Sequence, residues 1–103
     1  MAFRSIFVGD LCRLKPGLLA YDDKVIIFTK EIKDCVPGLF YGYEIYRTRD
    51  KFIFFAGRDL FLILEITNTS PSCYRFKILK NYKEIGYICL FEEDVDLAVE
   101  ILA

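Results

Sequence analysis

Two apolar segments decide the fold class: Tyr74-Arg75-Phe76-Lys77-Ile78-Leu79 and Ile85-Gly86-Tyr87-Ile88-Cys89-Leu90-Phe91. In the first segment apolar and basic residues alternate, so Tyr74, Phe76 and Ile78 share one face of a strand. Asn81-Tyr82-Lys83-Glu84 supplies a turn between the two segments. The sequence therefore predicts a β-hairpin over residues 74–91.

Strand patterns also dominate the chain before this hairpin. The β-branched and aromatic run at residues 25–29 predicts a strand, and residues 11–14 predict a short one. Residues 52–55 and 60–66 flank a short Gly-containing segment, which favours an antiparallel pair joined by a four-residue loop. The second of these runs is apolar on both faces and should be a central strand. Thr67–Ser72 is rich in Ser, Thr, Asn and Pro, a composition typical of a loop.

The C-terminal residues fit two periodicities. Val95, Ala98, Val99 and Leu102 would form the apolar stripe of a helix. Alternatively, residues 95–101 alternate between apolar and other side chains as in a strand. We favour a short helical turn at residues 92–95 and a closing strand at 97–101.

These elements amount to seven or eight short strands in 103 residues, with no long helical pattern before residue 92. Such a pattern predicts an all-β fold in the form of a small barrel. The length allows one domain, spanning residues 1–103. Hydrophobic residues make up 54% of the chain, which is enough for a packed core.

Composition also excludes several kinds of site. The chain has no histidine, which removes His-based general bases and nucleophile–His arrangements. The six glycines form no phosphate-binding loop, and the adjacent carboxylates lack catalytic or EF-hand spacing. We therefore expect no enzymatic activity and no cofactor. A net charge of −1 and a pI near 5.4 disfavour nucleic-acid binding through charge.

Four cysteines, at positions 12, 35, 73 and 89, stand apart from one another in the sequence. They contain no C-x-x-C pair, so we expect no metal site and interpret them as free, buried thiols. The N-terminus lacks the long apolar segment of a secretory signal, and the longest apolar runs are five residues. The sequence therefore predicts a soluble, cytoplasmic protein.

A resemblance emerges from two parts of the chain. Val8-Gly9-Asp10-Leu11-Cys12-Arg13-Leu14 resembles the V-G-D-L-V-R-L opening of small SH3-like barrel proteins of tailed phages, and residues 60–102 resemble the remainder of such a barrel. The resemblance implies a partly open SH3-like barrel with an elaborated insertion at about 18–56. It also implies a phage accessory protein in the cytosol of a host cell, with a host-directed or virion role. Because SH3-like barrels carry many unrelated functions, it does not specify an activity.

The densest candidate contact surface lies in residues 40–51. Eight of the 17 aromatic rings fall within residues 40–61 and occupy both faces of their strands, which exceeds what one barrel interior can hold. Tyr and Arg are enriched at protein–protein hot spots. The alternative is that a larger core buries these rings. The candidate partner-binding residues are Tyr41, Tyr43, Tyr46, Arg47 and Arg49.

Charge is divided unevenly along the chain. All 14 Lys and Arg residues lie at or before position 83, whereas residues 84–103 contain six acids and no base. This end either folds against the basic remainder or presents an acidic surface. Our main hypothesis is a non-catalytic protein-binding module that docks on a host protein, such as a defence or transcription component, and modulates or inhibits it. The alternatives are a self-assembling virion accessory protein and a binder of single-stranded nucleic acid, in which Arg and Tyr stack on bases.

Overall fold

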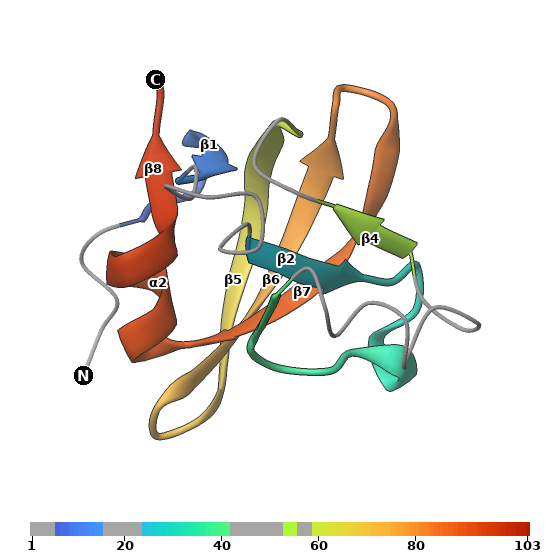
Figure 1. Cartoon of the computed structure of the whole chain (residues 1–103). Coiled ribbons are helices and arrows are strands. Elements are labelled where there is room, and N and C mark those ends of the chain that lie inside the picture. The colour runs from blue at the N-terminus through green and yellow to red at the C-terminus, as the bar shows by residue number, and fades with distance from the viewer. Residues whose placement is uncertain (1–5, 16–23, 42–52, 56–58) are drawn as a thin grey trace.

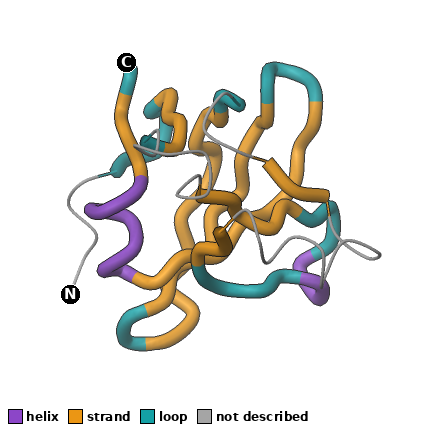
Figure 2. Tube along the Cα trace, in the orientation of Figure 1, coloured by secondary structure: helices purple, strands orange, loops and turns teal. Residues whose placement is uncertain are grey.

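The computed structural model of the chain describes residues 6–15, 24–41, 53–55 and 59–103 (Figure 1). These residues form two antiparallel sheets, one 3₁₀ turn and one short helix, with strand the prevailing structure (Figure 2). The larger sheet has strand order β7-β6-β5-β1-β8, and the smaller has β3-β2-β4. The elements are β1 (Leu11–Leu14), β2 (Lys24–Phe28), η2 (Ile32–Asp34), β3 (Leu39–Tyr41), β4 (Ile53–Phe55), β5 (Phe61–Ser70), β6 (Cys73–Lys80), β7 (Glu84–Phe91), α2 (Glu92–Ala98) and β8 (Val99–Ile101). The all-β fold class is confirmed.

The predicted hairpin is confirmed as β6 and β7. Its register runs without a shift from Cys73 opposite Phe91 to Lys80 opposite Glu84. Asn81 and Tyr82 have positive φ angles of 50° and 59°, so the turn uses the left-handed conformation that tight hairpin turns favour. Strand β5 pairs with both β6 and β1, which confirms its predicted central position.

The pairing of β4 and the end of β5 differ from the sequence-based prediction. Strand β4 pairs with β2 in the smaller sheet, so the predicted hairpin between residues 52–55 and 60–66 is wrong. Strand β5 continues to Ser70, because Thr67 and Asn68 pair with β6, and only residues 71 and 72 form the turn. The polar composition of residues 67–70 therefore indicates solvent exposure rather than a loop.

The C-terminal segment uses both periodicities in succession. Helix α2 extends to Ala98, beyond the expected end at residue 95, and β8 begins only at Val99. Val95 and Ala98 are buried one turn apart on α2, and Val99 continues the core from the strand. Strand β8 then pairs with β1, with Leu14 opposite Val99.

The core lies between the two sheets. Side chains from β1, β5, β6 and β7 point towards β2, whose residues 25–28 are all buried. Ile26 and Phe28 are fully buried in this core, so this described part of the expected insertion at 18–56 belongs to the centre of the molecule. The arrangement is compatible with a partly open SH3-like barrel.

The smaller sheet is attached to the free edge of β7. Thr29 and Tyr87 exchange both backbone hydrogen bonds, at 3.0 and 2.7 Å, and the Gly38 N–H donates to the Cys89 carbonyl at 3.1 Å. A Cβ on Gly86 would lie 2.5 Å from the Thr29 carbonyl oxygen and 2.6 Å from the Phe28 ring. Glycine at position 86 therefore allows β2 to cross closely over β7.

Candidate functional site

The predicted partner-binding residues lie almost entirely outside the described part of the chain. Tyr41 ends β3, where its backbone pairs with Lys24. The positions of Tyr43, Tyr46, Arg47 and Arg49 fall in residues 42–52, outside the described ranges. The contact surface around residues 40–51 therefore stays a prediction.

A second apolar surface lies on the face of the larger sheet that points away from the core. Leu11 is opposite Leu62, Leu62 is opposite Leu79, and Leu79 is opposite Ile85. Directly opposed residues of antiparallel strands point to the same side of the sheet. We call Leu11, Leu62, Leu79 and Ile85 the aliphatic row.

The aliphatic row is on the opposite side from the core because its sequence neighbours face inward. Cys12, Phe61 and Ile78 follow or precede row residues, and each is at most 1% exposed. In the row itself, the side chains on β1, β5 and β6 are half-buried and Ile85 is 54% exposed. Leu102 extends the row, since its N–H donates to the Leu11 carbonyl at 2.7 Å and it is 41% exposed.

Two ion pairs lie beside the aliphatic row. Arg13 follows Leu11 by two residues and its Nε lies 2.9 Å from Glu100 Oε2 on β8. Lys77 precedes Leu79 by two residues and its Nζ lies 3.4 Å from Glu65 Oε2 on β5. These pairs neutralise one another, so this part of the sheet surface is apolar with little net charge.

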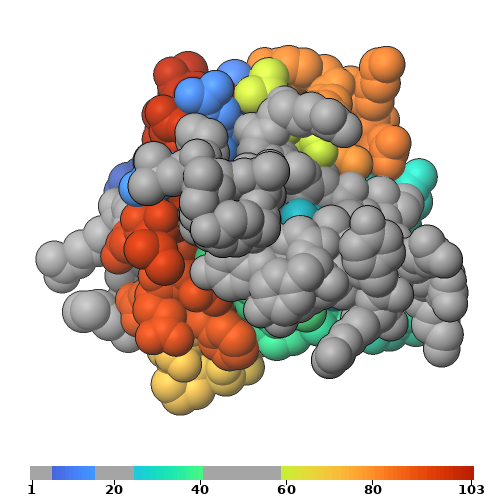
Figure 3. All heavy atoms as spheres, in the orientation of Figure 1, coloured from blue at the N-terminus to red at the C-terminus, as the bar shows by residue number. Residues whose placement is uncertain are grey.

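Two basic residues, Arg13 and Lys15, contact the acidic C-terminal segment. Glu100 forms the ion pair with Arg13, and Lys15 Nζ donates to the Asp96 carbonyl at 3.2 Å. Helix α2 forms one flank of the molecule in Figure 3 and carries Leu97, which is 62% exposed. Partial burial, followed by the nearby charge of Glu93, raises the pKa of the Asp94 carboxyl.

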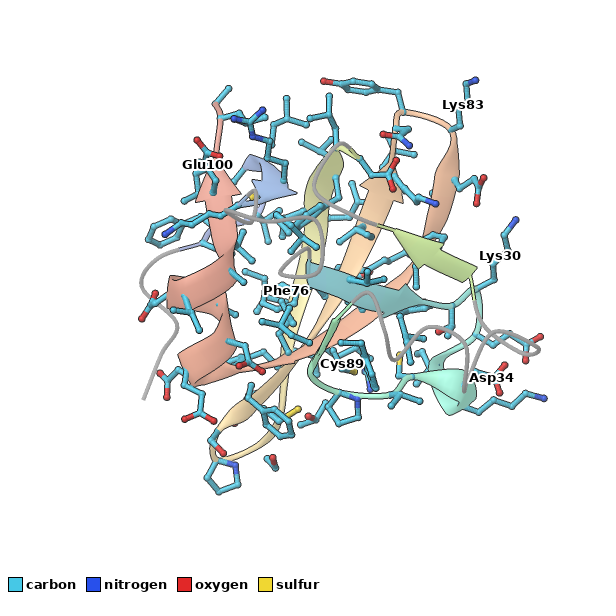
Figure 4. The ribbon with its side chains drawn as sticks, in the orientation of Figure 1. Lys30, Asp34, Phe76, Lys83, Cys89 and Glu100 are labelled. Atoms are coloured by element: carbon cyan, nitrogen blue, oxygen red, sulfur yellow. The ribbon has the colours of Figure 1, made fainter. Side chains whose placement is uncertain are left out.

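All four cysteines are free, as predicted, although Cys35 is only half-buried. Cys12 lies in the core, where burial, followed by the charge of Asp10, raises its thiol pKa to about 12. Cys89 lies on β7 behind the β2–β3 connection (Figure 4). Burial, then the neighbouring Cys35, also raises the pKa of Cys89 to about 12.

The aliphatic row is the surface that sequence reasoning missed. One signal was present, because residues 60–64 are all apolar in a strand, which places apolar side chains on both faces. Taken by itself, the run indicates only a central strand. The cross-strand register that joins Leu62 to Leu11 and Leu79 is not local information and could not be read from the run itself.

Comparison with protein-family models, with curated protein sequences and with solved structures finds no match to this chain. Among the residues that the structure describes, no group of three or more Cys, Asp or Glu side chains could hold a metal ion. The same residues include no helix with the length and apolar character needed to cross a bilayer.

Proposed function

We propose that the chain is a non-catalytic protein-binding module that docks through its aliphatic row on an apolar surface of another protein. The observation that carries this proposal is the register: four aliphatic side chains stand side by side on four neighbouring strands, on the face opposite to the core. An antiparallel sheet with one solvated face ordinarily alternates polar residues outward. Contiguous exposed apolar surface on a small protein marks an interaction site.

The charge distribution indicates the chemistry of the partner. The ion pairs Arg13–Glu100 and Lys77–Glu65 satisfy each other next to the row. A charged partner would have to break these pairs without replacing them by a buried pair of better geometry, which costs free energy. The complementary surface is therefore apolar and weakly charged, such as the apolar face of an amphipathic helix.

The tyrosines and arginines at the end of β3 and beyond it form the second part of the proposal. Tyr41, Tyr43, Tyr46, Arg47 and Arg49 have the side-chain types that contribute most at protein interfaces. The resemblance to phage SH3-like barrel proteins supports a host protein as the partner and an inhibitory or modulating role in the cytoplasm. That identification depends on the resemblance and the sequence alone.

Self-association is the second candidate function, and the paired charges favour it. An aliphatic face with little net charge does not repel an identical face, and two sheets can pack face to face at about 10 Å. In this case the same row would be buried between two copies of the chain.

Replacing one residue of the row tests the proposal. Ile85→Asp places a carboxylate at a 54% exposed position, where stability should change little. Leu97→Asp is the matched control, because Leu97 is a 62% exposed aliphatic residue on α2 rather than on the sheet. Proteins captured by the wild-type chain would be purified and titrated against both variants by calorimetry.

We expect Ile85→Asp to weaken binding at least tenfold, or about 1.4 kcal/mol, while Leu97→Asp binds as the wild type does. Equal affinities for all three chains would contradict docking through the row. A third variant, Tyr43→Ala with Arg47→Ala, should reduce binding at an unchanged melting temperature. A large fall in its melting temperature would place these residues in the core and remove them from the proposal.

Sedimentation velocity separates the two candidate functions. A monomer across micromolar concentrations favours docking on another protein. A defined oligomer that Ile85→Asp disperses, and Leu97→Asp does not, favours self-association. An oligomer unaffected by Ile85→Asp would show that the row is not the interface.

A further inference from the structure

Three of the four cysteines gather beside β7, although they are far apart in the sequence. Cys73 is opposite Phe91 and Arg75 is opposite Cys89, so the two cysteines lie diagonally on one face of the hairpin. This face points away from the core, since Tyr74, the neighbour of Cys73, belongs to the core. Cys35 reaches the same place from the connection between β2 and β3.

Backbone hydrogen bonds hold the Cys35 segment against β7 at both of its ends. Before it, Thr29 exchanges two hydrogen bonds with Tyr87. After it, Pro37 forms a parallel bridge with Cys89, and the Gly38 N–H donates to the Cys89 carbonyl. The position of Cys35 over Cys89 is thus fixed by the way the smaller sheet attaches to the larger one.

The sulfur atoms are connected by hydrogen bonds. Thr29 Oγ1 lies 3.0 Å from the Glu31 carbonyl oxygen, to which it donates, and 3.7 Å from Cys35 Sγ. Because the hydroxyl proton is already used, the Thr29 oxygen accepts from the Cys35 thiol. The Cys35 sulfur can then accept from the Cys89 thiol, with which it is hydrogen-bonded.

Access from solvent differs between the two thiols. Cys35 is half-buried, whereas Cys89 is only 6% exposed. The raised pKa of Cys89 keeps it protonated at neutral pH, so it is a poor first nucleophile. Cys35 is therefore the thiol that an oxidant reaches first, and Cys89 is the thiol positioned to respond.

We propose that Cys35 and Cys89 are a redox-sensitive pair that forms an intramolecular disulfide when the chain meets a hydroperoxide. The Cys35 sulfur attacks the peroxide, an S–O bond forms and the O–O bond breaks, and water or an alcohol leaves with the proton that the Cys35 thiol gives up. The Cys89 sulfur then attacks the Cys35 sulfenic acid, the S–S bond forms, and the hydroxyl leaves as water with the Cys89 proton. The two thiols lose two electrons and the hydroperoxide gains them.

Peptide mapping identifies the pair because trypsin places each cysteine on a different peptide. Cys35 falls within residues 34–47, Cys73 within 59–75, Cys89 within 84–103 and Cys12 within 5–13. The folded chain would be treated with dilute hydrogen peroxide, alkylated and digested without reduction. We expect a cross-linked species joining peptides 34–47 and 84–103, and the loss of two of the four titratable thiols.

Three controls make the result decisive. Cys73→Ser should leave the cross-link intact, whereas Cys89→Ser should abolish it and leave Cys35 oxidised to a sulfinic acid. In the urea-unfolded chain the shorter loop favours Cys73–Cys89 instead, because loop closure costs less entropy at shorter separation. A Cys73–Cys89 or Cys35–Cys73 cross-link as the main product in the folded chain, or sulfinic acids without any disulfide, would overturn the proposal.

Discussion

Both faces of the larger sheet carry aliphatic side chains, but these side chains have different surroundings. On the inner face, Phe76, Ile78 and Ile88 are at most 1% exposed and pack towards β2. On the outer face, Leu79 lies between Leu62 and the 54% exposed Ile85. Side-chain chemistry alone therefore does not distinguish the face that folds the molecule from the face that is available to a partner. The two faces differ because β2, attached to β7 through Thr29 and Tyr87, covers the inner face.

Neighbouring residues on opposite faces give the strongest test of this comparison. Ile78→Ala should lower the free energy of unfolding by about 2–5 kcal/mol, because it leaves a cavity in a packed core. Leu79→Ala removes an equal number of carbon atoms from a half-buried position and should cost only about 1 kcal/mol. Urea denaturation of both variants measures the difference. Equal losses would mean that the outer face supports the fold as much as the inner face does.

Cys12, on the inner face, should make the stability of the fold depend on pH in the alkaline range. Cys12 has its thiol pKa raised from the usual 9.0 to about 12, so its contribution to stability is intact below pH 9 and lost as the pH rises towards 12. At pH 10 the loss amounts to about 1.4 kcal/mol. Cys12→Ala removes this contribution and leaves that of Cys89, whose pKa is also raised to about 12. Under reducing conditions, the drop in unfolding free energy from pH 8 to pH 10 should be smaller in the variant by about that amount; identical drops would contradict a buried, protonated thiol.

The smallest effect is expected for the ion pairs of the outer face. The Arg13 and Glu100 side chains are 42% and 38% exposed, so solvent screens the pair. A double-mutant cycle with Arg13→Ala and Glu100→Gln should give a coupling of about 0.2–1 kcal/mol, decreasing with added salt. A coupling of several kcal/mol would show that this charge pair stabilises the sheet and is more than a neutralised border of the aliphatic row.

Local patterns predicted the part of the fold that local interactions build. The β6–β7 hairpin followed from alternation and a turn, since both are properties of adjacent residues. Pairing between distant strands is a different kind of information. The aromatic run that forms β4 has the same strand propensity whether it pairs with β5 or with β2. It pairs with β2, which is buried in the core.

Local sequence patterns also fail to predict the C-terminal segment and the outer surface. Residues 95–101 satisfy both the helical and the strand period, and the chain uses the helix up to Ala98 and the strand from Val99. The candidate surface depends on register: four aliphatic residues that are unremarkable in sequence become neighbours only when four strands align. The tyrosine and arginine surface in residues 41–49 is inferred from residue types, and the Tyr43→Ala with Arg47→Ala variant tests it.

The two lateral edges of the larger sheet have a consequence for growth into fibres. Strand-by-strand polymerisation needs two free edges on every subunit, one to accept the previous copy and one to offer to the next. In this sheet the β7 edge is already occupied by Thr29 and Gly38, and the β8 edge is only three residues long and carries Glu100. Edge pairing through this sheet would therefore stop at two subunits, so a molecule that exposes an apolar face can still avoid open-ended assembly through its strands.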